Sequence, residues 1–321
     1  MIRAVCLAKM WIPILFSLVL GLSAALADNS TKVVLGTATK GGGFELFGQA
    51  LTEVINATDT TLKIEAIASK GSTQNLQYLE EGKIDIGLVE GNAARQALDG
   101  IGRPPADLKV LAVMYPNPGM FVVLADSPYK SIEDLKGKPI AFGTRASGLR
   151  ILANDVLDGI GLNAERDFEQ VILEKAADGP NLVLEKQVAA LWGAGIGWPG
   201  FVKVANGSIG ARFITPSAAQ ITQILIKHPH LKSMSVPAGT YKGQNMQLNS
   251  VGLWSLILVR PEMSDELGYR LARAIHRGEQ KLASRLDQGS YTTLQNTAAY
   301  VPAERLHPGV ARYFHEVELT R

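Results

Sequence analysis

Short apolar runs alternate with longer amphipathic stretches along most of this 321-residue chain. In the first third, the apolar runs cover residues 32–37, 62–68, 84–89 and 110–115, and the amphipathic stretches cover residues 44–56, 72–81 and 92–98. Short apolar runs predict buried strands, and apolar residues at helical spacing predict helices. This alternation is typical of βαβ units, in which helices cover a mostly parallel sheet.

A second series of segments follows, which predicts a second α/β lobe. Its segments cover residues 121–125, 139–142, 147–160, 169–173, 182–185 and 188–192, with a helix around 218–227. Residues 251–259 then predict one more strand, followed by a long amphipathic helix from Ser264 to about Leu286. If that strand returns to the first lobe, the chain crosses between the lobes twice, near residues 117–120 and 245–252. Two crossings between two lobes form a hinge.

The N-terminus has the pattern of a secretory signal peptide. Arg3 and Lys9 precede an apolar run, which ends before the small-residue motif Ala25-Leu26-Ala27. A single membrane anchor is the alternative, but the apolar run is shorter than the ~20 residues that a spanning helix needs. We therefore expect residues 1–27 to be cleaved and the mature protein to be periplasmic.

Cysteine content and charge exclude two further classes of protein. The only cysteine, Cys6, lies in the predicted signal peptide, and a mature chain of this length can fold on its hydrophobic core without disulfides. Removal of Arg3 and Lys9 lowers the formal charge from +2 to zero. A neutral chain argues against nucleic-acid binding.

Two glycine-rich turns resemble nucleotide-binding loops but lack the residues that bind nucleotides. Gly36 and Gly41 have the spacing of a phosphate loop, but glycines follow where lysine and serine or threonine are needed. Residues 195–200 match the dinucleotide fingerprint, yet no acidic residue occurs between Glu185 and Glu262 to bind the ribose. We expect no cofactor.

Patterns of catalytic residues are also incomplete. Ser147 has Arg145 and Leu149 where a nucleophile elbow requires glycines. His228 and His230 could bind a metal together, but two histidines beside a proline in a polar loop are more often solvated. A dispersed Ser/His/Asp triad stays open, because its members need not be close in sequence. The prediction is a non-catalytic protein, with an exported α/β hydrolase as the rival.

Four polar turns follow predicted strands and precede predicted helices. They cover residues 40–44, 69–72 with Asn75, 90–92 and 143–148. The carboxyl ends of strands in an open α/β sheet line a crevice, and free N–H groups at helix starts favour small anions. Ordinary helix capping by Ser72, Asn92 and Ser147 is the alternative.

A series of motifs in order carries a resemblance to a known family. They are Gly36-Thr37 with Gly41-Gly42, Phe44 and Gly48; Gly71-Ser72 with Asn75-Leu76; the GKIDIGLVE strand (82–90); the LKGKPIAFGTRASG turn (135–148); Gly197-Trp198-Pro199; VPAGTY (236–241); and LHPGVARYFHE (306–316). Across nearly all of residues 32–321, the chain resembles the TAXI-family solute receptors of tripartite ATP-independent periplasmic (TRAP) transporters.

The resemblance implies a two-lobed α/β fold of the periplasmic binding protein type II class, with mostly parallel sheets. Residues 28–118 with 250–321 would form one lobe and residues 119–249 the other, with the ligand cleft between them. A monomer would capture a small organic acid or amino acid and deliver it to TRAP membrane subunits. A receptor for an ATP-driven (ABC) importer is the alternative. The predicted ligand-binding residues are Gly42, Gly43, Phe44, Gly71, Ser72, Asn75, Glu90, Asn92, Thr144, Arg145, Ser147, Gly148 and Trp198.

Several of these positions depart from the family pattern. Glu90 stands where glutamine is usual, Asn92 where aspartate is common, and Arg145 replaces a neutral residue. One hypothesis is a zwitterionic ligand whose carboxylate Arg145 clamps and whose ammonium Glu90 holds. Alternatively, Glu90 and Arg145 are solvated or pair with each other for a modest gain.

Two other side chains are ambiguous in the sequence. Trp198 either walls the pocket or packs in the core of the second lobe. Glu45 stands where the second aromatic of the family motif is usual, and the sequence does not explain an acid so close to a predicted anion site.

Overall fold

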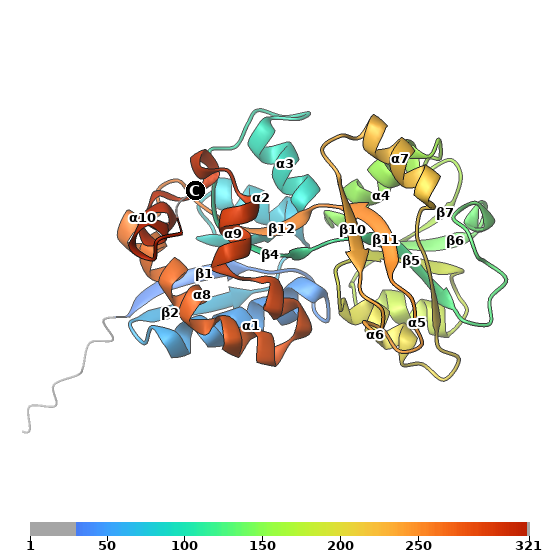
Figure 1. Ribbon diagram of the computed structural model, residues 1–321, viewed down its shortest axis with the longest axis horizontal. Coiled ribbons are helices and arrows are strands. Elements are labelled where there is room, and N and C mark those ends of the chain that lie inside the picture. Colours follow the sequence, from blue (N-terminus) through green and yellow to red (C-terminus); the bar gives the residue numbers. More distant parts are fainter. Residues whose placement is uncertain (1–29, 320–321) are drawn as a thin grey trace, which may run out of the picture.

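The computed structural model describes residues 30–319, so the predicted signal peptide, residues 1–27, lies outside the described residues. Two five-stranded sheets, each between layers of helices, lie side by side and form two lobes (Figure 1). This arrangement confirms the expected two-lobed α/β class. Within residues 30–319, no helix has both the length and the apolar character that a membrane span requires.

The first lobe contains the sheet with strand order β2-β1-β3-β12-β4. Its strands are β1 (Thr31–Gly36), β2 (Leu62–Ile67), β3 (Ile86–Val89), β4 (Lys109–Pro116) and β12 (Trp254–Val259). The long helices α1 (Gly43–Thr58) and α8 (Asp265–Arg285) pack together below the sheet in Figure 1, and α2 (Ser72–Glu80) and α3 (Gly91–Asp99) lie above it. The C-terminal segments are η2 (Asp287–Tyr291), α9 (Leu294–Tyr300), η3 (Ala303–Arg305) and α10 (Pro308–Glu316).

The second lobe contains the sheet with strand order β7-β6-β8-β5-β9. Its strands are β5 (Gly119–Leu124), β6 (Pro139–Thr144), β7 (Glu169–Leu173), β8 (Ala190–Ala194) and β9 (Ala211–Ile214). Helices α4 (Leu149–Gly159) and α7 (Ala218–Lys227) pack on one face, and α5 (Asp178–Leu184) and α6 (Pro199–Ala205) on the other. The remaining elements are η1 (Glu133–Leu135) and a two-stranded sheet of β10 (Lys232–Val236) and β11 (Leu248–Gly252).

Both large sheets are mostly parallel, as expected, and each contains one reversed strand. In the first sheet, β1 runs parallel to β2 and β3, but β12 runs antiparallel to β3 and β4. In the second sheet, β6 runs parallel to β7 and β8, but β5 runs antiparallel to β8 and β9. The reversed strands, β5 and β12, are those that directly follow a crossing between the lobes.

The predicted strand over residues 251–259 is two strands, β11 and β12, separated at Leu253. The separation lies where the two crossing segments meet. Both the backbone N–H and the side-chain amide of Asn117 donate to the Leu253 carbonyl, at 3.0 and 3.1 Å. A Cβ at Gly252 would lie 1.8 Å from the Asn117 carbonyl oxygen, so the second segment requires glycine at this crossing.

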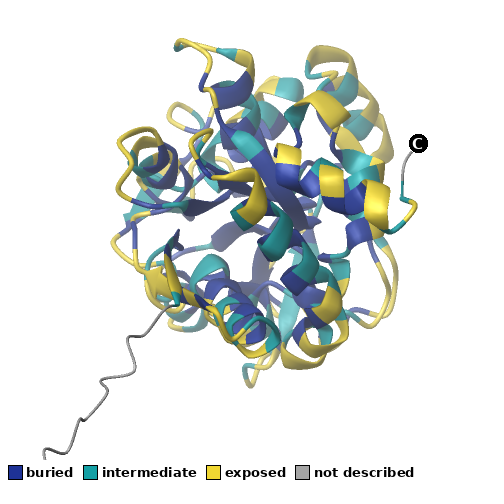
Figure 2. Ribbon diagram, turned by 90° about the vertical axis from the view of Figure 1, so that its left-hand side faces the viewer, coloured by how far each residue is buried: buried dark blue, intermediate teal, exposed yellow. Residues whose placement is uncertain are grey.

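The amphipathic patterns produce the buried core. Helix α1 buries Phe47, Leu51, Val54 and Ile55, which share one helical face. Figure 2 shows the strands buried in the interior and the exposed helix faces turned outward. At roughly 25 cal/mol per Å² of buried apolar surface, this packing is the main favourable contribution to folding.

Candidate functional site

A cavity that is partly open to solvent lies between the two lobes, where strands of both sheets end. The cavity volume available to the centres of water molecules is about 70 Å³. At roughly 10–15 Å³ per water, that space suits a handful of waters or an organic molecule of similar size. The lining residues come from both lobes: Ala38, Thr39, Gly42, Gly43, Phe44, Lys70, Gly71, Ser72, Glu90, Tyr115 and Asn117 from the first, and Gly143, Thr144, Ser147, Gly148, Leu149, Leu173, Ala176, Leu191, Trp192, Ala194 and Trp198 from the second.

Three helices begin at this cavity with glycine as the N-cap residue. Gly42 caps α1, Gly71 caps α2 and Gly148 caps α4, and all three glycines line the cavity. The N-cap glycines make no side-chain cap themselves, while the Ser147 hydroxyl accepts from the Leu149 N–H at the start of α4 at 3.3 Å. The first N–H groups of a helix and the positive end of its dipole both favour a negative charge. The cavity is therefore suited to a small anion.

The lobes are in direct contact around the cavity. The Thr73 N–H of the first lobe donates to the Ala146 carbonyl of the second at 3.2 Å. The Thr144 hydroxyl donates to the Lys70 carbonyl at 3.2 Å, and the Ala176 N–H donates to the Thr39 hydroxyl at 3.0 Å. These hydrogen bonds close the cleft over the cavity.

Glu90 is the one acidic residue among the described residues that line the cavity, and it is 1% exposed. Its carboxylate accepts hydrogen bonds from the N–H groups of Asn92 and Ala93 and from the Asn92 side chain. Burial nevertheless raises the pKa of Glu90 to about 8, against the opposite effect of these donors. Glu90 is thus mostly protonated at neutral pH, and a neutral carboxyl group does not repel an anionic ligand.

Aromatic side chains form much of the remaining wall. The Trp198 ring packs edge-on against Phe201, with ring centroids 4.9 Å apart, and a Cβ at Gly43 would lie 2.9 Å from Trp198 Cδ1. Trp198 therefore both lines the cavity and packs in the core of the second lobe. The two roles that the sequence left open for it are compatible. Phe44 and Tyr115 of the first lobe pack edge-on, with ring centroids 6.4 Å apart.

Most of the predicted ligand-binding residues line this one cavity. They are Gly42, Gly43, Phe44, Gly71, Ser72, Glu90, Thr144, Ser147, Gly148 and Trp198. Asn75, Asn92 and Arg145 do not line it. Direct contact of any of these residues with a ligand stays a prediction.

Asn75 and Asn92 have structural partners. The fully buried Asn75 amide donates to the carbonyls of Gly36, Thr37 and Leu88, at 3.2, 2.7 and 2.8 Å. It thereby ties α2 to β1 and β3. The Asn92 amide donates to the Glu90 carboxylate at 3.0 Å and so orients a side chain that does line the cavity.

Two charged residues that the sequence drew attention to lie outside the cavity wall. The Arg145 side chain is exposed, so the structure does not bring it into a carboxylate clamp or an ion pair with the buried Glu90. Glu45 accepts a hydrogen bond from the Gly41 N–H at 3.3 Å and one from the Gln49 side chain. It therefore stabilises the glycine turn before α1, which explains an acid at this position.

The sequence predictions omitted several residues of the wall. Tyr115 lines it from the end of β4, Asn117 from the first crossing between the lobes, and Trp192 from β8. The crossing itself was predicted, and it is the signal that could have identified Tyr115 and Asn117. The polar turn of residues 69–72 included Lys70 but did not single it out, and no pattern indicated Trp192, because their place depends on how the two lobes meet.

Comparisons with known proteins agree with this architecture. The model of the NMT1-like family matches residues 35–317. The alkanesulfonate-binding protein SsuA from Xanthomonas axonopodis pv. citri, bound to MOPS, has a TM-score of 0.50 and 19% identity over 88% of this chain and 83% of its own. A candidate L-cystine ABC transporter from Listeria monocytogenes has a TM-score of 0.51 and 14% identity, over 82% and 98%. A Xanthomonas citri protein bound to a chloride ion has a TM-score of 0.52 and 15% identity, over 90% and 97%.

At these identities the solved structures establish the fold alone. The chain has the two-sheet α/β fold of type II periplasmic binding proteins.

Proposed function

The chain belongs to the NMT1-like family, and from that premise we propose that it is a periplasmic solute-binding protein that captures a small carboxylate between its lobes. The observation that carries the proposal is the convergence of three glycine-capped helix starts, α1, α2 and α4, on one cavity between the lobes. Two of these helices belong to the first lobe and one to the second. A ligand that needs both lobes stabilises the closed form, which is how binding is coupled to lobe closure.

The chemistry of the wall narrows the ligand class. N–H groups at helix starts suit a carboxylate, while Phe44, Leu191 and Trp198 suit a short apolar part. The small volume favours a short organic acid over a large sulfonate or a nucleotide. A small amino acid is a second candidate, because Glu90 could ionise beside a ligand ammonium group.

The membrane partner is a separate part of the proposal. Delivery to an ABC importer is supported by the Listeria neighbour, which is an ABC transporter component by its name. Delivery to TRAP membrane subunits rests on the sequence motifs alone. We favour the ABC importer, and the neighbouring genes test this choice: an ATPase gene supports it, whereas large fused membrane subunits support the TRAP alternative.

A thermal-shift experiment tests the binding function. The mature protein is melted with short monocarboxylates, dicarboxylates, oxoacids and amino acids, after native mass spectrometry for any co-purified compound. We expect a saturating rise in melting temperature with one class, because a ligand that binds only the folded state stabilises it by mass action. The control is Gly43→Ala, whose methyl group would lie 2.9 Å from Trp198 Cδ1 and narrow the cavity.

Three results would count against the proposal. The first is a lack of response to every small anion and zwitterion together with no co-purified compound. The second is chemical turnover of the bound compound, which would favour the exported hydrolase. A response that Gly43→Ala leaves unchanged would place the ligand elsewhere.

A further inference from the structure

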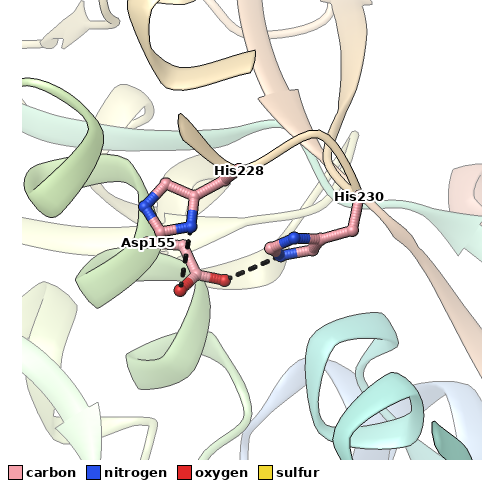
Figure 3. A group of neighbouring side chains, drawn as sticks. All are labelled: Asp155, His228 and His230. Atoms are coloured by element: carbon pink, nitrogen blue, oxygen red, sulfur yellow. Dashed lines mark hydrogen bonds and ion pairs between the residues drawn. The ribbon is translucent and has the colours of Figure 1, made fainter. Parts of the chain in front are cut away.

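Two histidines and an aspartate meet on the second lobe, away from the ligand cavity. Asp155 lies in the second half of α4, and His228 and His230 lie in the loop between α7 and β10. One ligand atom from each of the three lies within 4.8 Å of the other two. Figure 3 shows the two imidazole rings on either side of the Asp155 carboxylate.

The hydrogen bonds of His228 leave one ring nitrogen free for a cation. Its Nε2 lies 2.8 Å from Oδ2 of Asp158, so the ring proton belongs on Nε2. Its Nδ1 then presents a lone pair toward Oδ1 of Asp155, at 3.7 Å. Two acceptors that face each other repel, and a cation between them removes the repulsion.

The distances suit a tetrahedral metal ion. Two ligand atoms at about 2.1 Å from zinc, at the tetrahedral angle, lie about 3.4 Å apart. Oδ1 of Asp155 lies 3.7 Å from His228 Nδ1 and Oδ2 lies 3.0 Å from His230 Nε2, so each histidine is near that value from one of the two carboxylate oxygens. Asp158 supplies the outer carboxylate that commonly orients a metal-bound histidine.

The Asp155 carboxylate has a hydrogen bond with His230 Nε2 at 3.0 Å, which a metal ion would replace, and it is partly accessible to solvent. Among residues 30–319, Asp155 pairs with no lysine or arginine, since the nearby Lys227 pairs with Asp158 at 2.8 Å. The side chains of Asp155, His228 and His230 are 22%, 16% and 15% exposed. A metal ion can therefore enter from solvent, and a water molecule can complete the coordination.

We propose that Asp155, His228 and His230 form a zinc site that ties α4 to the loop between α7 and β10. Two imidazole nitrogens and one carboxylate oxygen are ligands that zinc accepts readily. Helix α4 begins at Gly148, in the cavity wall, and carries Asp155 further along. The metal therefore anchors a helix whose first turn faces the ligand. This site is independent of the proposed solute-binding function.

Calorimetry with zinc chloride tests the proposal. The mature chain, without a histidine tag and stripped with a chelator, should bind one zinc ion, and cobalt should bind with the visible absorption bands of tetrahedral coordination. We expect His228→Ala and His230→Ala each to abolish this binding. Asp158→Asn should weaken it by about 10- to 100-fold, as is usual for an outer carboxylate.

The matched control is His315→Ala, because His315 is exposed on α10, far from the cluster in sequence. Circular dichroism checks that every variant is folded. Zinc should also raise the melting temperature of the native protein and of His315→Ala, but not of the two cluster variants. Absence of binding, or binding that His228→Ala and His230→Ala leave unchanged in folded protein, would overturn the proposal.

Discussion

Gly148, at the start of α4, packs directly on Glu90, at the start of α3. A Cβ at Gly148 would lie 2.6 Å from Glu90 Cβ and 2.9 Å from the Ser72 hydroxyl. Gly148 has φ of −61°, a conformation that any residue adopts, so its backbone does not require glycine. Glycine is required at this position because the two lobes approach each other closely here.

The first prediction follows from this contact. Gly148→Ala should weaken ligand affinity by roughly tenfold or more, because the added methyl group would clash with Glu90 in the closed form. A steric cost of about 1.4 kcal/mol to closure lowers the affinity tenfold. The ligand-free protein should keep its melting temperature within a few degrees, since opening the lobes relieves the clash. Calorimetry measures the affinity, and X-ray scattering measures the compaction on binding. Asn154→Ala, on the exposed face of the same helix, is the control and should behave as the native protein.

The second prediction concerns pH. The pKa of Glu90 is raised from 4.5 to about 8. Between pH 4.5 and about pH 8, Glu90 is therefore protonated in the folded state but ionised in the unfolded state. Stability should therefore be greatest below pH 4.5 as far as Glu90 is concerned, and should fall by about 1.4 kcal/mol per pH unit up to about pH 8. Glu90→Gln should remove this decline and be more stable than the native protein above pH 8. Urea unfolding at a series of pH values measures it, and parallel profiles for the two proteins would contradict the prediction.

The third prediction separates a structural role from a binding role at Asn75. Asn75→Ala leaves three backbone carbonyls without this donor and opens a cavity, so it should lower stability by about 2–4 kcal/mol. Ligand affinity, measured well below the melting temperature, should stay within about twofold of the native value. Ser72→Ala is a comparison at a neighbouring position that does line the cavity. A large loss of affinity with unchanged stability would instead place Asn75 at the ligand.

The fold was largely predictable because its signals are local. Strand and helix periodicity, and glycine turns between them, are read within short stretches such as residues 33–51. The direction of β12 could not be predicted, because it depends on where the chain returns after crossing between the lobes. The break at Leu253 has the same cause, since Asn117, its hydrogen-bond partner, is distant in sequence.

The candidate site shows the same limit. The glycine turns at helix starts drew attention to Gly42, Gly71 and Gly148, which line the cavity. Side-chain directions were beyond the sequence: Arg145 and Thr144 are adjacent, yet only Thr144 lines the cavity. A charged residue in a turn indicates a polar site nearby, but it does not show toward which side of the turn its side chain points.

The last prediction concerns the source of positive charge for the ligand. Lys70 is the one basic residue that lines the cavity within the described part of the chain, whereas Arg145 is exposed outside the wall. Lys70→Ala should lower affinity for a carboxylate by about two- to fivefold, the size expected for an exposed charge pair, and the loss should shrink at high salt. Lys70→Arg should retain most of the affinity, and Arg145→Ala should change it by less than about twofold. Calorimetry at two ionic strengths measures all three, and a loss on Arg145→Ala larger than on Lys70→Ala would restore the arginine clamp that the sequence suggested.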